Sequence, residues 1–490
     1  MISEKLKAAR EYEKANAAKV PEAESPLFHA RGAIGWINDP NGFSIYKGEY
    51  HLFFQYHPYS TFWGPMHWGH VKTKDFIKWE QLPIAIAPDS DFDARGCFSG
   101  SAIELPDGRQ LLVYTGVSEG KDEKGNPVDY QQQCIAIGDG IDYEKCSLNP
   151  VIDTTMIPQG HNRYDFRDPK VFEKEGKYYL VVGSRTGDTS GSILLYSSED
   201  YIHWNYEGIV DKCNDEYGKM WECPDYFELD GKQVILTSPQ DMQPDGLEFH
   251  AGNGTVALIG EGDGLLQFNR QAVQAIDYGI DFYAPQTLLT DDGRRIMIGW
   301  MQNWDTCNQW HEDRTFYGQM TLPRELSVKD GRLYQSPVRE IENYYDGMIS
   351  YDDINVKGKT SLDGIDGRIF DMTVTIKPQE NFCWLKLNLA EDDRYATCIK
   401  YDKTEGKVRI DRSRSYSRRD IVSVREFLVE PEQGTITLRI IMDKNAIELF
   451  VNDGKYASST MINTPLSADK ISFESYGDVK LDIVRHDIRI

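Results

Sequence analysis

The stretch Tyr46-Lys47-Gly48-Glu49-Tyr50-His51-Leu52-Phe53-Phe54 joins a tight turn to an apolar run, and this arrangement recurs along the chain. Four later copies lie at residues 107–113, 175–181, 230–236 and 292–298. The turn glycines, Gly48, Gly108, Gly176, Gly231 and Gly293, are separated by 60, 68, 55 and 62 residues. A turn followed by a short β-rich run is typical of antiparallel strands. The repetition predicts a five-bladed β-propeller with loops inserted in its blades.

One position of the repeat is rich in acids. Counting back eight or nine residues from the turn glycines reaches Asp39, Ser99, Asp168, Glu222 and Ala284. Three of these five residues are carboxylates, and each carboxylate lies within two residues of a proline. Because the first strand of a propeller blade lines the central axis, we expect the five side chains to converge at one mouth of the channel.

Three converging carboxylates have more than one explanation. Acids that precede turns often accept backbone hydrogen bonds, which is a purely structural role. Hard cations accept clustered carboxylates, and His67 and His70 could add nitrogen ligands. The surrounding segment 57–70 also contains Trp63 and Trp68, which suit a platform for a sugar. Since three acids share one repeat position, we disfavour the structural role, and we predict neither a metal nor a cofactor.

The sequence around each acid suggests a role in glycoside cleavage, which needs two carboxylates on opposite sides of the scissile bond. Glu222 stands between Trp221 and Cys223, an apolar setting that suits a proton donor with a raised pKa. Asp39 is surrounded by asparagines, whose hydrogen bonds are expected to keep it ionised as a nucleophile. Asp168 follows an arginine and is expected to stay charged and bind sugar hydroxyls.

Five motifs, in this order, resemble one known family. They are Trp36-Ile37-Asn38-Asp39-Pro40-Asn41-Gly42, Phe98-Ser99-Gly100, Phe166-Arg167-Asp168-Pro169, Glu222-Cys223-Pro224-Asp225 and Leu322-Pro323-Arg324-Glu325-Leu326. The chain resembles the β-fructofuranosidases of glycoside hydrolase family 32, which include invertases, sucrose-6-phosphate hydrolases and fructanases. Ile37 replaces the methionine that is usual in that family. The family's five-bladed propeller followed by a β-sandwich agrees with the repeat.

The resemblance implies a retaining, double-displacement mechanism with Asp39 as nucleophile, Asp168 as transition-state stabiliser and Glu222 as acid/base. The residues that it implies for binding the fructosyl unit are Asn38, Gln55, Trp63, Phe98, Ser99, Arg167 and Trp300. The expected reaction is hydrolysis of terminal β-D-fructofuranosides, such as sucrose, sucrose 6-phosphate or short fructo-oligosaccharides.

Several alternatives to sucrose hydrolysis stay open. Within the family they are fructan hydrolysis and fructosyl transfer, and a hydrolase of arabinose- or xylose-containing glycans can share the fold. A non-catalytic carbohydrate-binding propeller is the alternative of another class, although it would be expected to have lost one of the three acids. Residues 303–317 match the family less well and are expected to shape the leaving-group side. A phosphate there would need cations, for which the candidates are Arg163, Lys170, Arg185 and Arg314.

The pattern of polar and apolar residues changes after the repeats. Eight compact segments of alternating polarity lie between residues 368 and 484, with turns such as Asn452-Asp453-Gly454, and they predict a β-sandwich. The basic, Ser-rich run 412–419 is expected to be a solvated hairpin. We expect an N-terminal helical segment at 1–27, a catalytic propeller at 28–345 and a sandwich domain at 346–490, in an all-β protein with one short helix.

Composition limits the class of protein. Hydrophobic residues make up 40% of the 490 residues, which is enough for buried cores. The formal net charge of −24 disfavours nucleic acid and anionic membranes as partners. No apolar run reaches the roughly 18 residues of a membrane span, and residues 1–19 lack the apolar core of a secretory signal. The eight cysteines show no paired spacing. We therefore expect a cytoplasmic protein that binds a small sugar, and the sequence does not distinguish a monomer from a homo-oligomer.

Overall fold

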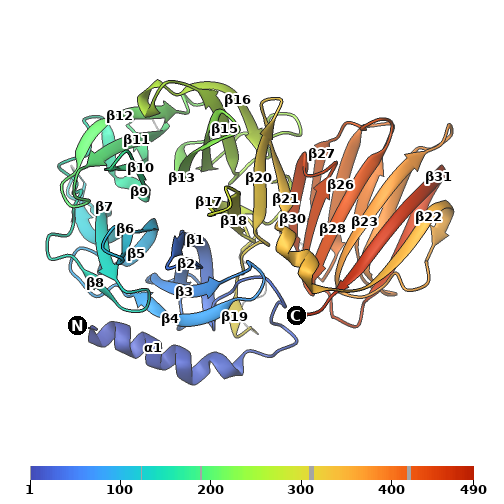
Figure 1. Ribbon diagram of the computed structural model, residues 1–490, viewed down its shortest axis with the longest axis horizontal. Coiled ribbons are helices and arrows are strands. Elements are labelled where there is room, and N and C mark those ends of the chain that lie inside the picture. The colour runs from blue at the N-terminus through green and yellow to red at the C-terminus, as the bar shows by residue number, and fades with distance from the viewer. Residues whose placement is uncertain (1, 123, 188–189, 308–313, 417–420) are drawn as a thin grey trace.

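The structure, a computed structural model, describes residues 2–122, 124–187, 190–307, 314–416 and 421–490. Two β-domains lie side by side, and helix α1 (Glu4–Asn16) lies along the outer edge of the first (Figure 1). The Ser3 side chain caps this helix by accepting a hydrogen bond from the backbone N–H of Leu6. The expected N-terminal helix is thus confirmed. In the part of the chain that the structure describes, no helix is long and apolar enough to cross a membrane.

The first domain is a five-bladed β-propeller, as the repeat predicts (Figure 1). From the axis outwards, the first blade contains β1 (Gly35–Tyr46), β2 (Glu49–His57), β3 (His67–Thr73) and β4 (Glu80–Ile86). The second contains β5 (Gly96–Glu104), β6 (Gln110–Lys121), β7 (Pro127–Gly138) and β8 (Tyr143–Lys145). The third contains β9 (His161–Lys174), β10 (Lys177–Thr186), β11 (Gly191–Ser198) and β12 (Asn205–Lys212). The fourth contains β13 (Met220–Leu229), β14 (Lys232–Gln240), β15 (Val256–Glu261) and β16 (Asn269–Ala275). The fifth contains β17 (Tyr283–Leu289), β18 (Arg295–Trp300), β20 (Arg324–Lys329) and β21 (Arg332–Pro337).

The repeated turns join the innermost strand of each blade to the second strand. Their glycines have φ between 75° and 85°, the left-handed region that glycine adopts without strain. A Cβ added to any of them would meet no atom within 4 Å, so backbone conformation rather than space requires glycine here. The sequence repeat therefore reflects a repeated turn geometry.

The ring is closed by a short strand, β19 (Phe316–Tyr317), that comes from the fifth blade. It pairs in parallel with the start of β1, where Gly35 faces Phe316 and Trp36 faces Tyr317. The innermost strands β1, β5, β9, β13 and β17 each contact the innermost strands of the two neighbouring blades. The first and last blades are thus joined beside the motif at residues 36–42.

The second domain is the predicted β-sandwich. Its strands are β22 (Tyr345–Thr360), β23 (Ile369–Pro378), β24 (Trp384–Glu391), β25 (Ala396–Asp402), β26 (Lys407–Arg414), β27 (Val424–Leu428), β28 (Ile436–Asp443), β29 (Ala446–Val451), β30 (Tyr456–Met461) and β31 (Lys470–Ile488). The segments expected as separate strands at 471–475 and 479–484 form one long strand, β31, which pairs with β24 and then with β23. The polar strand β22, missed in the sequence, begins directly after the 3-10 helix η3 (Arg339–Tyr344). The expected domain boundaries, after residues 27 and 345, stay predictions.

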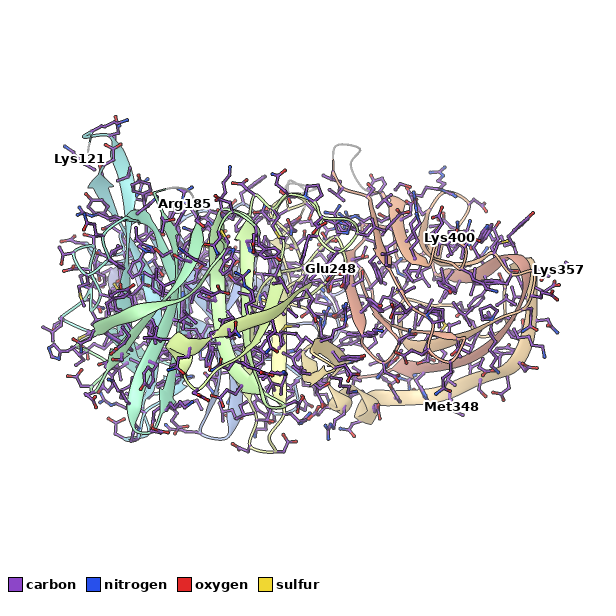
Figure 2. The ribbon with its side chains drawn as sticks, turned by 90° about the horizontal axis from the view of Figure 1, so that it is seen from above. Lys121, Arg185, Glu248, Met348, Lys357 and Lys400 are labelled. Atoms are coloured by element: carbon purple, nitrogen blue, oxygen red, sulfur yellow. The ribbon has the colours of Figure 1, made fainter. Side chains whose placement is uncertain are left out.

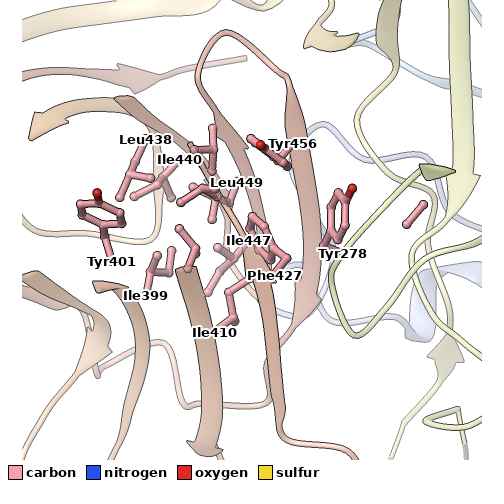
Figure 3. Packing of buried hydrophobic residues seen from close by; sticks show 14 of the residues in the cluster. Tyr278, Ile399, Tyr401, Ile410, Phe427, Leu438, Ile440, Ile447, Leu449 and Tyr456 are labelled. Atoms are coloured by element: carbon pink, nitrogen blue, oxygen red, sulfur yellow. The ribbon is translucent and has the colours of Figure 1, made fainter. Parts of the chain in front are cut away.

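Aliphatic side chains from the two layers of the sandwich pack together in its core, including Ile399, Ile410, Leu438, Ile447 and Leu449 (Figure 3). The core continues towards the propeller, because the Tyr278 ring stacks on Phe427 with 4.9 Å between ring centroids (Figure 3). The two domains therefore share apolar packing at their contact.

A buried ionic network also crosses this contact. Arg324, from the last of the five motifs, pairs with Glu448 of the sandwich at 2.6 Å and with Asp277 of the propeller at 2.9 Å. His29 lies between Glu448, at 3.0 Å, and Asp443, at 2.8 Å. Burial alone would lower the pKa of His29, but its two acidic partners outweigh burial and raise the pKa to about 9. The network therefore holds two cations and three acids.

The basic run 412–419 corrects an expectation, because Arg412 is fully buried rather than solvated. Its guanidinium pairs with Asp281 of the propeller at 2.5 Å and donates to the carbonyl of Met461 at 2.7 Å. The acid that compensates its charge is 131 residues away in sequence, so the local pattern could not indicate burial. Residues 417–420 of this run lie outside the described residues.

Replacing Arg324 with Met should lower the free energy of unfolding by about 3–5 kcal/mol, because Glu448 and Asp277 would stay buried without their cation. Thermal and urea unfolding measure this loss. Arg339→Met is the matched control, because Arg339 pairs with Glu325 at an exposed site and should leave the midpoint almost unchanged. Equal midpoints for the two variants would contradict a stabilising role of the network.

Candidate active site

A cavity of about 540 Å³ opens at the axis of the propeller. Nine of the ten residues predicted for the site line it: Asn38, Asp39, Gln55, Trp63, Phe98, Ser99, Arg167, Asp168 and Glu222. Gln131, Asp165, Gln240, Asp241, Asn253 and Trp304 complete the wall and were not singled out in the sequence. Arg185, which pairs with the wall residue Asp165, lies on the same side of the propeller as Lys121 (Figure 2). The cavity mouth therefore faces this side.

Each innermost strand breaks register with the second strand at the level of the cavity. The breaks lie between Ile37 and Pro40, Phe98 and Gly100, Arg167 and Lys170, Glu222 and Asp225, and Tyr283 and Gln286. Such bulges release residues from the ladder and re-aim their side chains. The backbone of Asp168, Cys223 and Ala284 is also left-handed, with φ of 67°, 49° and 52°. The repeated bulge turns the predicted positions towards the axis.

Asp39 is held by a donor on each carboxylate oxygen. Ser99 Oγ donates to Oδ2 at 2.7 Å, and Asn38 Nδ2 donates to Oδ1 at 3.1 Å. Asn38 is itself oriented by Trp36, whose Nε1 donates to the Asn38 amide oxygen at 2.8 Å. The motif at residues 36–42 thus fixes the carboxylate by a chain of hydrogen bonds.

Cys223 connects Asp39 with Asp168. Its thiol lies 3.5 Å from Oδ2 of each aspartate, and its backbone N–H donates to Asp168 at 3.0 Å. The two carboxylates therefore face the same small space from different blades.

Glu222 is bound on both oxygens. Arg167 donates to Oε1 through Nε at 3.0 Å and through Nη2 at 2.9 Å, and the Tyr283 hydroxyl donates to Oε2 at 2.6 Å. Arg167 also donates to Asp165 at 2.9 Å, so it bridges two acids. The expected apolar setting of Glu222 is thus corrected, because two polar side chains contact its carboxylate.

Trp300 does not line the cavity. It is fully buried behind the wall, and its ring lies 5.0 Å from that of Trp304, which does line the cavity. Trp36 stacks on Tyr317 with 5.3 Å between ring centroids and also packs against Trp300 and Trp304, at 5.9 Å and 6.2 Å. Trp304 belongs to the segment expected to shape the leaving-group side, of which residues 308–313 lie outside the described residues.

Comparison with known proteins now decides the family. The chain matches the model "Glycosyl hydrolases family 32 N-terminal domain" over residues 29–337 and "Glycosyl hydrolases family 32 C terminal" over residues 340–489. The chain belongs to glycosyl hydrolase family 32. The predicted resemblance is therefore confirmed.

Relatives of this family 32 enzyme are similar over almost its whole length. A raffinose invertase of Escherichia coli is 34% identical, with 93% of each chain covered. The structure of a Bombyx mori GH32 β-fructofuranosidase variant in complex with sucrose is 30% identical, with a TM-score of 0.85 and coverage of 99% of this chain and 98% of that one. The structure of a sucrose-6-phosphate hydrolase from Lactobacillus gasseri is 28% identical, with a TM-score of 0.84 and coverage of 98% and 96%.

Two acids of this family 32 site, Asp39 and Asp168, hold protons more tightly than isolated carboxylates. Burial raises the pKa of Asp39, and the charge of Glu222 raises it further, so that its hydrogen bonds offset only part of the rise. Burial raises the pKa of Asp168 to about 7, against the opposing charge of Arg167 and with the help of Glu222 and Asp39. The raised pKa of Asp168 differs from the expectation that this carboxylate stays charged, because burial and the charges of Glu222 and Asp39 outweigh the groups that lower the pKa.

None of the cations proposed for a phosphate, Arg163, Lys170, Arg185 and Arg314, is among the residues that line the cavity. Lys170 is buried against Asp225 at 3.0 Å, Arg185 pairs with Asp165, and Arg314 donates to Asn463. Among the wall residues that the structure describes, Arg167 is the one lysine or arginine, whereas Asp39, Asp165, Asp168, Glu222 and Asp241 are acids. Within the described residues, no group of three or more His, Cys, Asp or Glu side chains is arranged to hold a metal ion.

Asp168→Asn should stabilise the protein at pH 8 relative to the wild type. The pKa of Asp168 is higher in the folded protein than the ordinary value of 3.8, so its proton favours folding below about pH 4, and this contribution is lost as the pH rises through about 7. A neutral amide avoids the buried charge that remains at pH 8. Melting temperatures at pH 8 and pH 5 test this, and the gain should shrink at pH 5. A variant that melts lower than the wild type at pH 8 would contradict it.

Proposed function

We propose that this family 32 enzyme is a retaining β-fructofuranosidase that hydrolyses the fructosyl bond of sucrose and related terminal β-D-fructofuranosides. The observation that carries the proposal is the convergence of Asp39, Asp168 and Glu222, from three blades, in one cavity. Two carboxylates that face one sugar can divide nucleophile and acid roles between them. The third can accept hydrogen bonds from the hydroxyl groups of the sugar.

In the first step, Glu222 gives its proton to the glycosidic oxygen while an Asp39 oxygen attacks C2 of the fructosyl unit. The C2–O bond to the leaving sugar breaks, and a fructosyl ester forms on Asp39. Ser99 and Asn38 hold the two oxygens of Asp39, which limits its motion before the attack. Arg167 and Tyr283 hold the Glu222 carboxyl group in a fixed orientation for proton transfer.

In the second step, Glu222 takes a proton from water, and the water oxygen attacks C2 and displaces Asp39. Two displacements restore the β configuration. Asp168 does not form a bond to carbon in this scheme. Its carboxylate, fixed by the Cys223 N–H, accepts hydrogen bonds from sugar hydroxyls that strengthen as positive charge develops on the ring.

The relatives support sucrose as the substrate, since one solved structure is a sucrose complex and another relative is named an invertase. Fructan hydrolysis and fructosyl transfer remain the alternatives within the family. A non-catalytic sugar-binding propeller is disfavoured, because all three acids line the cavity. We further propose that the protein works in the cytoplasm, which its eight free cysteines support.

Asp39→Asn and Glu222→Gln should each lower kcat for sucrose by about a thousandfold or more, because each removes one reacting group. Release of glucose and fructose measures the rate, and circular dichroism checks the fold. Asp107→Asn, in the turn of the second blade, is the control and should keep the wild-type rate. Near-normal rates in either cavity variant would refute the proposal.

The two cavity variants should differ in a way that separates their roles. Glu222→Gln should lose much less rate on p-nitrophenyl β-fructofuranoside, whose leaving group needs no protonation. Asp39→Asn should lose its rate on both substrates. In the wild type, NMR should detect β-fructofuranose before the α anomer, and α-fructofuranose as the first product would exclude a retaining mechanism.

Sucrose should be a better substrate than sucrose 6-phosphate, because the described wall has five acids and one arginine that already bridges Glu222 and Asp165. Comparing kcat/KM for sucrose, sucrose 6-phosphate and 1-kestose tests this preference. Asp241→Asn removes one negative charge from the wall and should raise the relative rate for the phosphorylated sugar. A higher kcat/KM for sucrose 6-phosphate in the wild type would show that a phosphate site exists.

A further inference from the structure

The loop between β2 and β3, residues 58–66, carries an aromatic side chain to the cavity and is named here the aromatic loop. Trp63 lines the cavity and is 49% exposed, with its ring 6.0 Å from that of Phe98 in an edge-to-face arrangement. An exposed ring at a cavity mouth can stack on a sugar only if its loop is held in place. The contacts that hold this loop therefore affect sugar binding.

Within the described residues, the aromatic loop rests on three rings at its base. Tyr59 packs against His57 and His67, at the two ends of the loop, with 5.8 Å and 5.9 Å between ring centroids. Gly64, next to Trp63, lies on the His57 ring so closely that an added Cβ would be 2.7 Å from it. The position of Trp63 thus depends on the His57 ring, and the His57 ring packs on Tyr59.

Helix α1 reaches this base from outside the propeller (Figure 1). Leu6 and Ala9 are buried in the core of the first blade, and Arg10 donates to the carbonyl of Ile84 at 2.8 Å. Two residues further along the helix, the Tyr12 ring lies 4.9 Å from that of Tyr59. The anchored helix therefore supports the aromatic loop through one ring pair.

We propose that α1 sets the affinity of the cavity for its sugar, with Tyr12 as the positioning residue that holds Tyr59 and, through His57, Trp63. The proposal rests on the fructosidase function proposed above, together with the fructosyl-binding role that the family resemblance implies for Trp63. Tyr12 is not among the residues that line the cavity. Its loss should weaken substrate binding and transition-state binding equally, which raises KM and leaves kcat unchanged.

Tyr12→Ala should raise KM for sucrose about three- to tenfold, the range expected for an aromatic pair, with kcat within twofold of the wild type. Tyr12→Phe keeps the ring and should match the wild type. Glu11→Ala, at an exposed position of the same helix, is the control and should also match. A purely structural role of Tyr12 would lower the melting temperature without changing KM, and that result would overturn the proposal.

A double-mutant cycle identifies the route of the effect. In a Trp63→Ala background, Tyr12→Ala should raise KM no further, since the ring that it positions is gone. Additive effects of the two substitutions would overturn the proposed route. If Tyr12→Ala does not fold, Tyr59→Leu takes its place in the same cycle. Failure of the fructosidase function is distinguishable, because wild-type protein that neither hydrolyses sucrose nor binds fructose in calorimetry would overturn both proposals.

Discussion

The break in register that recurs on every innermost strand is the constraint on which the site depends. A regular strand would direct alternate side chains to its two faces, whereas the bulge frees one or two residues per blade to point at the axis. The propeller then brings five such breaks to one level. Left-handed backbone at Asp168, Cys223 and Ala284 shows that the chain adopts an unfavourable conformation at this level. Asp39, Asp168 and Glu222, which carry the proposed chemistry, lie at three of these breaks.

That convergence creates an electrostatic conflict, since the buried Asp39 and Asp168 lie close to each other and to the partly buried Glu222. Arg167 partly relieves it by bridging Glu222 and Asp165, and the Cys223 thiol separates Asp39 from Asp168. The repulsion that remains contributes to the raised pKa values of Asp39 and Asp168. A site proposed to stabilise positive charge on a sugar therefore brings like charges together, as expected where function opposes stability.

The parts of the fold that were predictable are those with a local cause. The turn glycines mark left-handed backbone. The spacing of these glycines was therefore enough to predict the five blades and the position of Asp39 within its blade. Arg412 and Trp300 were misplaced, because each packs against a residue distant in sequence, Asp281 and Trp36 respectively, that tertiary structure brings to it. Strand β22 was missed because its outward residues are polar, as is common for edge strands. Gln240 is the last residue of β14 and Asp241 follows it, and Gln55 lies near the end of β2, the equivalent strand of the first blade. Comparing equivalent strands of the repeat could therefore have predicted that Gln240 and Asp241 line the cavity.

The closure of the ring by β19 has a consequence for the order in which the protein is made. The strand that bears Asp39 leaves the ribosome early, but its partners Phe316 and Tyr317 follow some 280 residues later, about 15–60 s at ordinary rates of synthesis. Asp443, which binds His29, emerges later still. Until β19 is made, the start of β1, including Trp36, lacks its partner on this edge. The cavity can be completed only when the last blade returns to the first.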